Sequence, residues 1–310
     1  MVLLGRKEEG PTLAPGDTMT TKNIDALPLL SRRQASRGIL LAIGGAALFA
    51  CGGGSTNGTG AQAGNGSGNG TGTGDGNGTT TDPEGTTTGS ATEWASGGTK
   101  SMTGASSYPD PFATPATACV LAVAATEGPC TEAADQVRKD ISEGYTGLPM
   151  RLALRVVDSS CKPIAGAKVK VWHTQISGSY SGDTPNNQMC LKDRADSAKH
   201  YFRGAQTTDE NGRVDFDSCF PGWYRGRAVH IHFTVSLGGR SFTSQLVFDQ
   251  DLVNEIFTNH AEYKGYGLPD TTNSTDNIVG RGDLAGYTLK TARMSDGAML
   301  ASKDLVVNLA

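Results

Sequence analysis

The chain has 310 residues, a formal net charge of −4, and Lys, Arg, Asp and Glu interspersed along its length. This balance excludes the basic runs of a nucleic-acid-binding protein and the acidic tail of a cation buffer. From Cys51 to Lys100 there is no Val, Ile, Leu, Met or Phe, so this stretch cannot bury enough apolar surface to offset the ordering of its backbone. About 200 residues remain after it, a length that suits a single all-β domain.

The N-terminal segment predicts export. Arg32 and Arg33 precede an apolar run at residues 38–50. That run is too short to span a bilayer comfortably and has a basic front, which is typical of a signal peptide. Paired arginines before a Gly/Ala-rich run are similar to a twin-arginine export signal, although the usual hydrophobic residues do not follow the pair. We therefore expect residues 1–50 to be a signal peptide, with Met19 giving a more normal signal length than Met1.

Residues Leu48-Phe49-Ala50-Cys51 resemble a lipobox, in which the cysteine is lipidated and becomes the mature N-terminus. The glycine-rich stretch begins directly after Cys51, as a surface anchor requires. We expect a membrane-anchored lipoprotein on the extracytoplasmic side, facing the periplasm or the cell surface, with a flexible tether over residues 51–115 and a folded domain over residues 116–310. The alternative is an ordinary cleaved signal with a chance cysteine.

Five cysteines follow the expected tether, and an exported protein is free to form disulfides. Because five is odd, at most two bridges form and one thiol remains; counting alone leaves fifteen arrangements. None of the cysteines shows the paired CxxC spacing of a structural zinc site, so we do not expect such a site. The five are Cys119, Cys130, Cys161, Cys190 and Cys219.

In chain order, the pattern first predicts a short helix over residues 132–143 and then changes to period two. Short alternating segments separated by Gly, Asn and Asp turns predict an antiparallel β-sandwich of about eight strands, with long loops and little helix. The expected strands are residues 151–157, 167–173, 214–216 after a turn at 209–212, 229–237, 241–248 and 304–308.

His230 and His232 lie two apart within one expected strand, so both imidazoles share a face and Ile231 takes the other. Two histidines on one face can grip a metal ion, although a bare HxH is more often incidental. Tyr224 follows a Pro-Gly turn, and Tyr180 follows a Gly/Ser loop. Taken singly, each tyrosine is more simply an aromatic at the rim of the domain.

Several spaced motifs together resemble the intradiol ring-cleavage dioxygenases, and most closely their exported, single-domain bacterial relatives. The resemblance runs from about residue 126 to residue 257, less than half of the chain but most of the expected domain. The motifs are Ala125-Thr126-Glu127-Gly128-Pro129, Val171-Trp172 with Gly178-Ser179-Tyr180, Arg203-Gly204 with Thr208-Asp209, Pro221-Gly222-Trp223-Tyr224, Arg227-Ala228-Val229-His230-Ile231-His232-Phe233, and Gln245-Leu246.

The resemblance implies a ferric ion held by Tyr180, Tyr224, His230 and His232. The donor chemistry agrees, because Fe(III) is a hard acid that favours oxygen anions. Two phenolates and one hydroxide would balance its charge, and metal coordination would deprotonate the phenols. This donor set fits zinc, or a ferrous ion with two histidines and a carboxylate, less well.

The resemblance also implies the catalytic roles. A catechol would lose two protons and displace hydroxide and Tyr224, and the displaced groups would act as bases. Arg227 would stabilise the developing negative charge, and Gln245 would lie near the substrate oxygens. The simpler readings are a surface arginine at Arg227 and an incidental glutamine at Gln245.

The leading expectation is therefore an Fe(III)-dependent intradiol dioxygenase that acts with dioxygen on a small aromatic diol outside the cytoplasm. Two alternatives stay open: a non-catalytic surface lipoprotein module with a relict metal site, and an oxygenase acting on non-catechol aromatics. The chain departs from the exported relatives at Cys130, Thr131 and Thr174, which puts substrate preference in doubt. A homodimer also remains open. The family often forms dimers, but through elements that are missing here.

Overall fold

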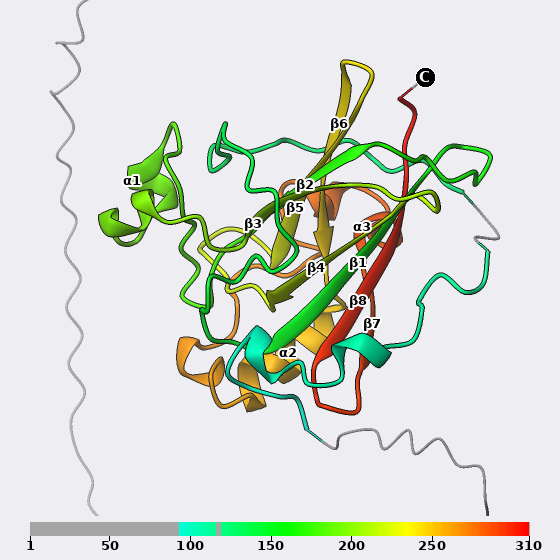
Figure 1. Ribbon diagram of the computed structural model, residues 1–310. Helices are drawn as coiled ribbons and strands as arrows, with labels where there is room; N and C mark the ends of the chain where they lie inside the picture. Colours follow the sequence, from blue (N-terminus) through cyan, green and yellow to red (C-terminus); the bar gives the residue numbers. More distant parts are fainter. Residues whose placement is uncertain (1–92, 116–118, 310) are drawn as a thin grey trace, which may run out of the picture. The chain divides into compact units, whose positions relative to one another are not determined.

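A computed structural model describes residues 93–115 and 119–309. The expected signal peptide, Cys51 and most of the expected tether lie outside these residues. Within them, two four-stranded sheets pack face to face (Figure 1), with strand orders β4-β1-β8-β7 and β3-β2-β5-β6. The expected β-sandwich is confirmed.

The strands of the first sheet are β1 (Pro149–Val157), β4 (Arg213–Cys219), β7 (Lys290–Arg293) and β8 (Met299–Val306); those of the second are β2 (Lys168–Trp172), β3 (Arg203–Thr207), β5 (His230–Leu237) and β6 (Arg240–Val247). The helices are α1 (Asn187–Cys190), α2 (Gln250–Asn259) and α3 (Leu284–Tyr287), with short 3₁₀ turns η1 (Thr99–Ser101), η2 (Ala105–Ser107), η3 (Arg194–Ala198), η4 (Lys264–Tyr266) and η5 (Val279–Arg281). No helix in this part of the chain is both long and apolar enough to cross a membrane.

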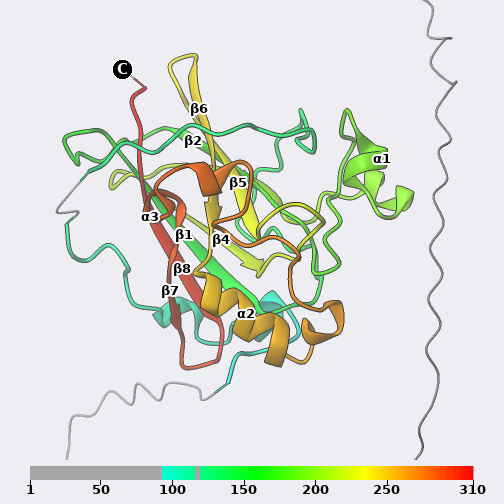
Figure 2. The same ribbon diagram turned by 180° about the vertical axis from the view of Figure 1, so that it is seen from behind.

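Period-two alternation builds the core between the sheets. In β5, Ile231, Phe233 and Val235 are buried in the main hydrophobic cluster, and Leu152 and Leu154 of β1 join it from the other sheet. The pairing is antiparallel except between β1 and β8, which run parallel. The sandwich is therefore mixed rather than wholly antiparallel. Helix α2 adds Val253, Ile256 and Phe257 to the cluster and is seen best from behind (Figure 2).

The prediction of a short helix over residues 132–143 is wrong. The backbone there bonds to two strand edges instead: Ala205 N donates to Gln136 O at 2.8 Å, and Ile141 N donates to Asp217 O at 2.9 Å. Ala205 lies in β3 and Asp217 in β4, so the segment joins the edges of both sheets. Val137 is 81% exposed, which shows that the near-helical spacing of apolar residues did not mark a buried face.

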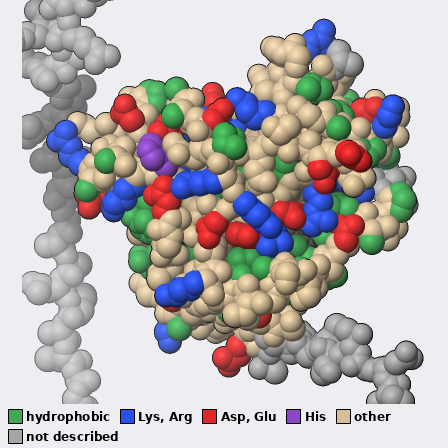
Figure 3. Space-filling view, in the orientation of Figure 1, with side chains coloured by type: hydrophobic (Ala, Val, Ile, Leu, Met, Phe, Trp, Pro, Cys, Tyr) green, Lys and Arg blue, Asp and Glu red, His purple; other side chains and the backbone are tan. Residues whose placement is uncertain are grey.

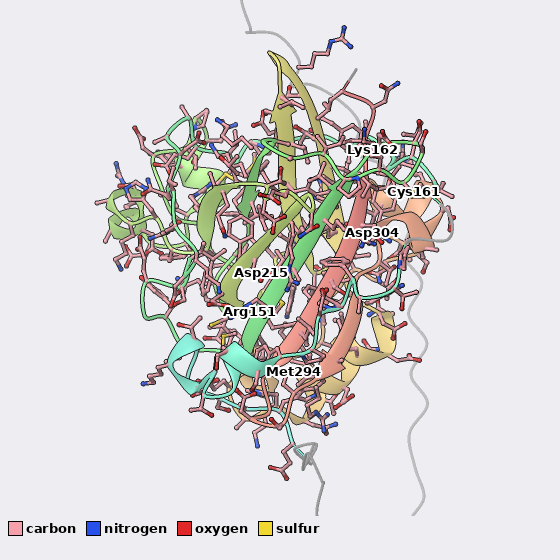
Figure 4. The ribbon with its side chains drawn as sticks, turned by 45° about the vertical axis from the view of Figure 1, so that its right-hand side comes forward. Arg151, Cys161, Lys162, Asp215, Met294 and Asp304 are labelled. Carbon is pink, nitrogen blue, oxygen red and sulfur yellow. A yellow bond between two sulfur atoms is a disulfide. The ribbon has the colours of Figure 1, made fainter. Side chains whose placement is uncertain are left out.

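The expected extent of the tether is also wrong at its C-terminal end, because residues 93–115 pack on the domain. We call this segment the N-terminal strap. The Tyr108 ring lies under the Arg151 guanidinium. The guanidinium carbon of Arg155 lies 4.7 Å from the centroid of the Phe112 ring. Figure 4 shows Arg151 and Asp304 on the outward face of the β4-β1-β8-β7 sheet, and Figure 3 shows side chains of both charges side by side over this region. The strap therefore belongs to the folded unit.

The cysteines form the bridges Cys119–Cys161 and Cys130–Cys190, and Cys219 is left as a buried thiol. This outcome confirms the expected limit of two bridges and one remaining thiol.

Candidate metal centre

Four donor atoms from three parts of the chain converge beside β5. The Nε2 atoms of His230 and His232 lie 3.0 Å apart. The phenol oxygens of Tyr180 and Tyr224 lie 3.2 and 3.3 Å from His230 Nε2 and 3.5 Å from each other. The expected quartet is therefore brought together by the fold, with Ile231 on the opposite, core-facing side of the strand.

The two tyrosine loops are held against each other by a close backbone crossing. Tyr180 lies in the loop after β2, and Tyr224 lies in the loop between β4 and β5. A Cβ atom on Gly178 would stand 1.9 Å from Trp223 O, and one on Gly222 would stand 2.3 Å from the carbonyl oxygen of Gln175. Because any side chain would collide with backbone at both positions, glycine is required for the tyrosines to meet.

The histidine rings are oriented in different ways. His230 Nδ1 lies 2.6 Å from Ala228 O, so this nitrogen donates its hydrogen and leaves the Nε2 lone pair for a metal. His232 Nδ1 has no partner among the described residues. Its ring stacks on Trp172 with an interplanar angle of 6°, and a Cβ on Gly128 would lie 3.3 Å from its Cε1 atom. His232 is therefore held by packing.

Burial sets the protonation of the quartet. Desolvation lowers the pKa of His230 to about 3 and that of His232 well below its usual value. Desolvation raises the pKa of Tyr180 well above its usual value, and it raises that of Tyr224 against the opposing charge of Arg227. Both imidazoles are thus neutral with free lone pairs, while the phenols need a nearby cation to ionise.

Arg227 and Gln245 form one network beside Tyr224. Arg227 Nη1 lies 3.5 Å from Tyr224 Oη, and Arg227 Nη2 donates to Gln245 Oε1. The Gln245 amide nitrogen donates to Thr126 O at 3.0 Å. Gln245 is fully buried, so both ends of its side chain are occupied in positioning Arg227 and the Thr126 segment.

Asp276 is a residue of this site that the sequence did not reveal. Its side chain is fully buried, and Oδ2 accepts from both Arg227 Nε and Ala228 N at 2.8 Å. The lowered pKa of Asp276 reflects these hydrogen bonds, which outweigh its desolvation. One residue therefore connects Asp276 to each of two expected ligands. Arg227 lies between Asp276 and Tyr224, and Ala228 lies between Asp276 and His230.

The quartet fits a metal ion by its donor chemistry and spacing. Ligands about 2 Å from one ion lie about 3 Å from each other, and His230 Nε2 lies 3.0–3.3 Å from the other three donors, with the two phenol oxygens 3.5 Å apart. Two phenols and two neutral imidazoles suit Fe(III), which favours anionic oxygen. Within the described residues, no group of three or more His, Cys, Asp or Glu side chains is arranged to hold a metal.

The remaining three histidines form contacts away from the quartet. His173 is buried between Thr174 O and the Ser218 hydroxyl. His200 pairs with Glu132, and His260 lies 2.9 Å from Ala95 O.

Known proteins resemble the chain over the region that builds this site. Residues 125–264 match a family described as Dioxygenase. The chain is 24% identical over 191 residues to a catechol 1,2-dioxygenase of Acinetobacter baylyi, covering 54% of this chain and 59% of the relative. It is 30% identical over 122 residues to a chlorocatechol 1,2-dioxygenase of Rhodococcus opacus, covering 33% of this chain and 44% of that relative. The chain thus spans about half the length of these two curated relatives.

A solved structure is similar over most of its length. An intradiol ring-cleavage dioxygenase from Tetranychus urticae superposes with a TM-score of 0.55 and 30% identity, covering 61% of this chain and 95% of that chain. A second dioxygenase structure superposes with a TM-score of 0.54 and 28% identity.

Proposed function

Because this chain belongs to the intradiol ring-cleavage dioxygenase family, we propose that it is an Fe(III)-dependent dioxygenase that opens the ring of a catechol-type aromatic. The observation that carries the proposal is the convergence of two phenol oxygens and two imidazole nitrogens, in which His230 Nε2 lies within 3.3 Å of the other three atoms. In this proposal Tyr180, Tyr224, His230 and His232 hold the iron. A bound ferric ion would supply hard Lewis-acid chemistry suited to the oxygens of a diol.

The chain's own residues then divide the remaining work. Tyr224 is the more accessible of the two phenols, so we assign it the role of base for one substrate hydroxyl. Arg227, whose Nη1 lies 3.5 Å from the Tyr224 oxygen, stabilises negative charge that develops there. Gln245 holds Arg227 in place. The two neutral imidazoles take no part in proton transfer in this scheme.

We further propose that the reaction takes place outside the cytoplasm on a protein anchored through Cys51. The support is the lipobox-like sequence and the basic, apolar segment before it. The catechol and chlorocatechol named for the two curated relatives give the class of substrate to test first.

The decisive experiment is an anaerobic titration of the iron-loaded protein with catechols. Phenolate-to-iron charge transfer should colour the protein, and chelation of a diol should shift the visible band. We expect His232→Ala to lose iron and Tyr224→Phe to keep iron with an altered band, measured by metal analysis and absorbance. Full iron retention by His232→Ala would contradict the ligand assignment.

The competing function is a surface binding module with a relict site. That reading predicts a colourless protein even when iron is supplied, and no oxygen uptake with any diol. The intact quartet favours the enzyme, because a binding module has no reason to keep four converging metal donors.

A further inference from the structure

We propose that the Cys130–Cys190 disulfide is a positioning element of the metal centre, so that tight Fe(III) binding by this chain depends on that bridge. The inference rests on the proposed function above.

The bridge lies inside the site rather than on the surface of the sandwich. Both of its cysteines are buried in one cluster with Trp172 and Tyr180, and Tyr224 packs against that cluster. The bridge therefore contacts the same group of side chains that contains two of the proposed ligands and the ring that stacks on a third.

On one side, the bridge holds the segment that supports Tyr180. Tyr180 N donates to Cys190 O at 3.0 Å. Cys190 ends the short helix α1, which belongs to a projecting lobe at the left of Figure 1. This lobe lies outside both sheets, so strand pairing does not fix the position of Cys190.

On the other side, the bridge holds the segment that covers His232. Residues 123–132 contain no strand, yet Gly128 approaches His232 so closely that an added Cβ would lie 3.3 Å from its ring. Cys130 comes two residues later. Because His232 Nδ1 has no hydrogen-bond partner in the described structure, contact with Gly128 and stacking on Trp172 are what orient this ring.

Arg203 also connects the Cys130 segment to the Tyr180 segment, through hydrogen bonds. Its Nη2 donates to Cys130 O at 2.8 Å and its Nε donates to Ser181 O at 3.0 Å. The Cys130 and Tyr180 segments are thus joined twice, once by sulfur and once by a buried guanidinium. Breaking the covalent joint leaves one link between two irregular segments, and the donors of His232 and Tyr180 can then move apart.

The chain supplies its own control, since its second bridge, Cys119–Cys161, has a similar Cα separation of 5.4 Å and neither of its cysteines belongs to the cluster at the site. We compare C130A/C190A with C119A/C161A in the mature full-length protein, using iron content, affinity in competition with a chelator, the visible band and the melting temperature. Loss of an outer-shell support weakens metal binding by about 10- to 100-fold. We expect that loss and a shifted band in C130A/C190A, and both properties unchanged in C119A/C161A.

Equal iron affinity and an identical band in wild type and C130A/C190A would overturn the inference while leaving the proposed function intact. A wild-type protein that binds no iron would instead overturn the proposed function. If C130A/C190A does not fold, Gly128→Ala tests the same placement with both bridges present. Its added methyl should displace the segment over His232 and weaken iron binding, and an unchanged affinity and band would overturn the inference.

Discussion

Arg227 has two of its guanidinium nitrogens committed to neighbours, and this leaves Nη1 directed at Tyr224. Asp276 holds Nε at 2.8 Å, Gln245 accepts from Nη2, and Nη1 lies 3.5 Å from the Tyr224 oxygen. Such fixed donors act on developing charge without reorganising during the reaction. The catalytic value of Arg227 should therefore depend on Asp276, which never reaches the substrate in this arrangement.

We expect Asp276→Asn to lower kcat by about 10- to 100-fold while iron content stays full, since the removed carboxylate orients Arg227 and is not a ligand. Steady-state oxygen uptake and metal analysis measure the two effects separately. Asp270→Asn is the matched control, because Asp270 accepts from Gly226 N of the same loop at 3.0 Å but is exposed. A normal kcat in Asp276→Asn, or an equal loss in both variants, would contradict this role.

The family resemblance of the sequence implied that the four proposed ligands meet, whereas nothing in the sequence pointed to Asp276. His230 and His232 carry a spacing that fixes their shared face, and the tyrosines stand in motifs with glycine turns. Asp276 stands in a Thr/Asn/Ser-rich loop beyond the family match at residues 125–264. Only the folded chain brings that loop beside Arg227, because the contact spans 49 positions.

At the scale of elements, a few side-chain contacts rather than average composition determine the structure of the N-terminal strap. Its many Gly, Ser and Thr residues predict a tether, but Trp94, Tyr108 and Phe112 each meet an arginine on the domain surface. Tyr108 also donates to Asp296 at 2.7 Å. A few well-placed aromatic side chains therefore decide the structure of a segment whose average composition indicates disorder.

We expect Tyr108→Ala to lower the free energy of unfolding by about 2 kcal/mol, because it removes a hydrogen bond to a carboxylate and a cation–π contact. Urea unfolding followed by fluorescence measures the change. Met189→Ala is the control, since Met189 is 75% exposed on the projecting lobe. Equal stability of Tyr108→Ala and wild type would mean that the strap contributes nothing to the fold.

The strands show where alternation is informative and where it fails. The segments that became β1, β2, β5 and β6 were predicted closely, because one face of each packs into the core. Strand β7 was missed: its sequence Lys-Thr-Ala-Arg has no buried residue, so it leaves no hydrophobic pattern. Its place comes from antiparallel hairpin pairing with β8, which the side chains of β7 do not signal.

At the scale of the whole molecule, the two sheets are joined by a buried polar contact as well as by apolar packing. His173 follows β2 of one sheet, and its Nε2 lies 2.8 Å from the hydroxyl of Ser218 in β4 of the other. The ring is fully buried and stacks on Phe202. Desolvation by burial lowers the pKa of His173 to about 4, so the folded sandwich keeps this imidazole neutral.

This buried imidazole makes the stability of the sandwich depend on pH. In the unfolded chain the imidazole has its ordinary pKa of about 6.5, so between about pH 6.5 and pH 4 the unfolded state binds a proton that the folded state does not. The resulting stability is fully present above about pH 6.5 and is lost as the pH falls toward 4, by about 3 kcal/mol in total.

We expect His173→Gln to lose this part of the pH dependence, even if hydrogen-bond losses make it less stable than wild type at pH 7.5. Urea unfolding of the metal-free protein at several pH values between 7.5 and 4.5 measures the difference. Ser218→Ala is the control, since it removes the partner hydroxyl but keeps the buried imidazole, and so should keep the steeper decline. Parallel curves for wild type and His173→Gln would show that the imidazole joining the two sheets is already protonated in the folded protein.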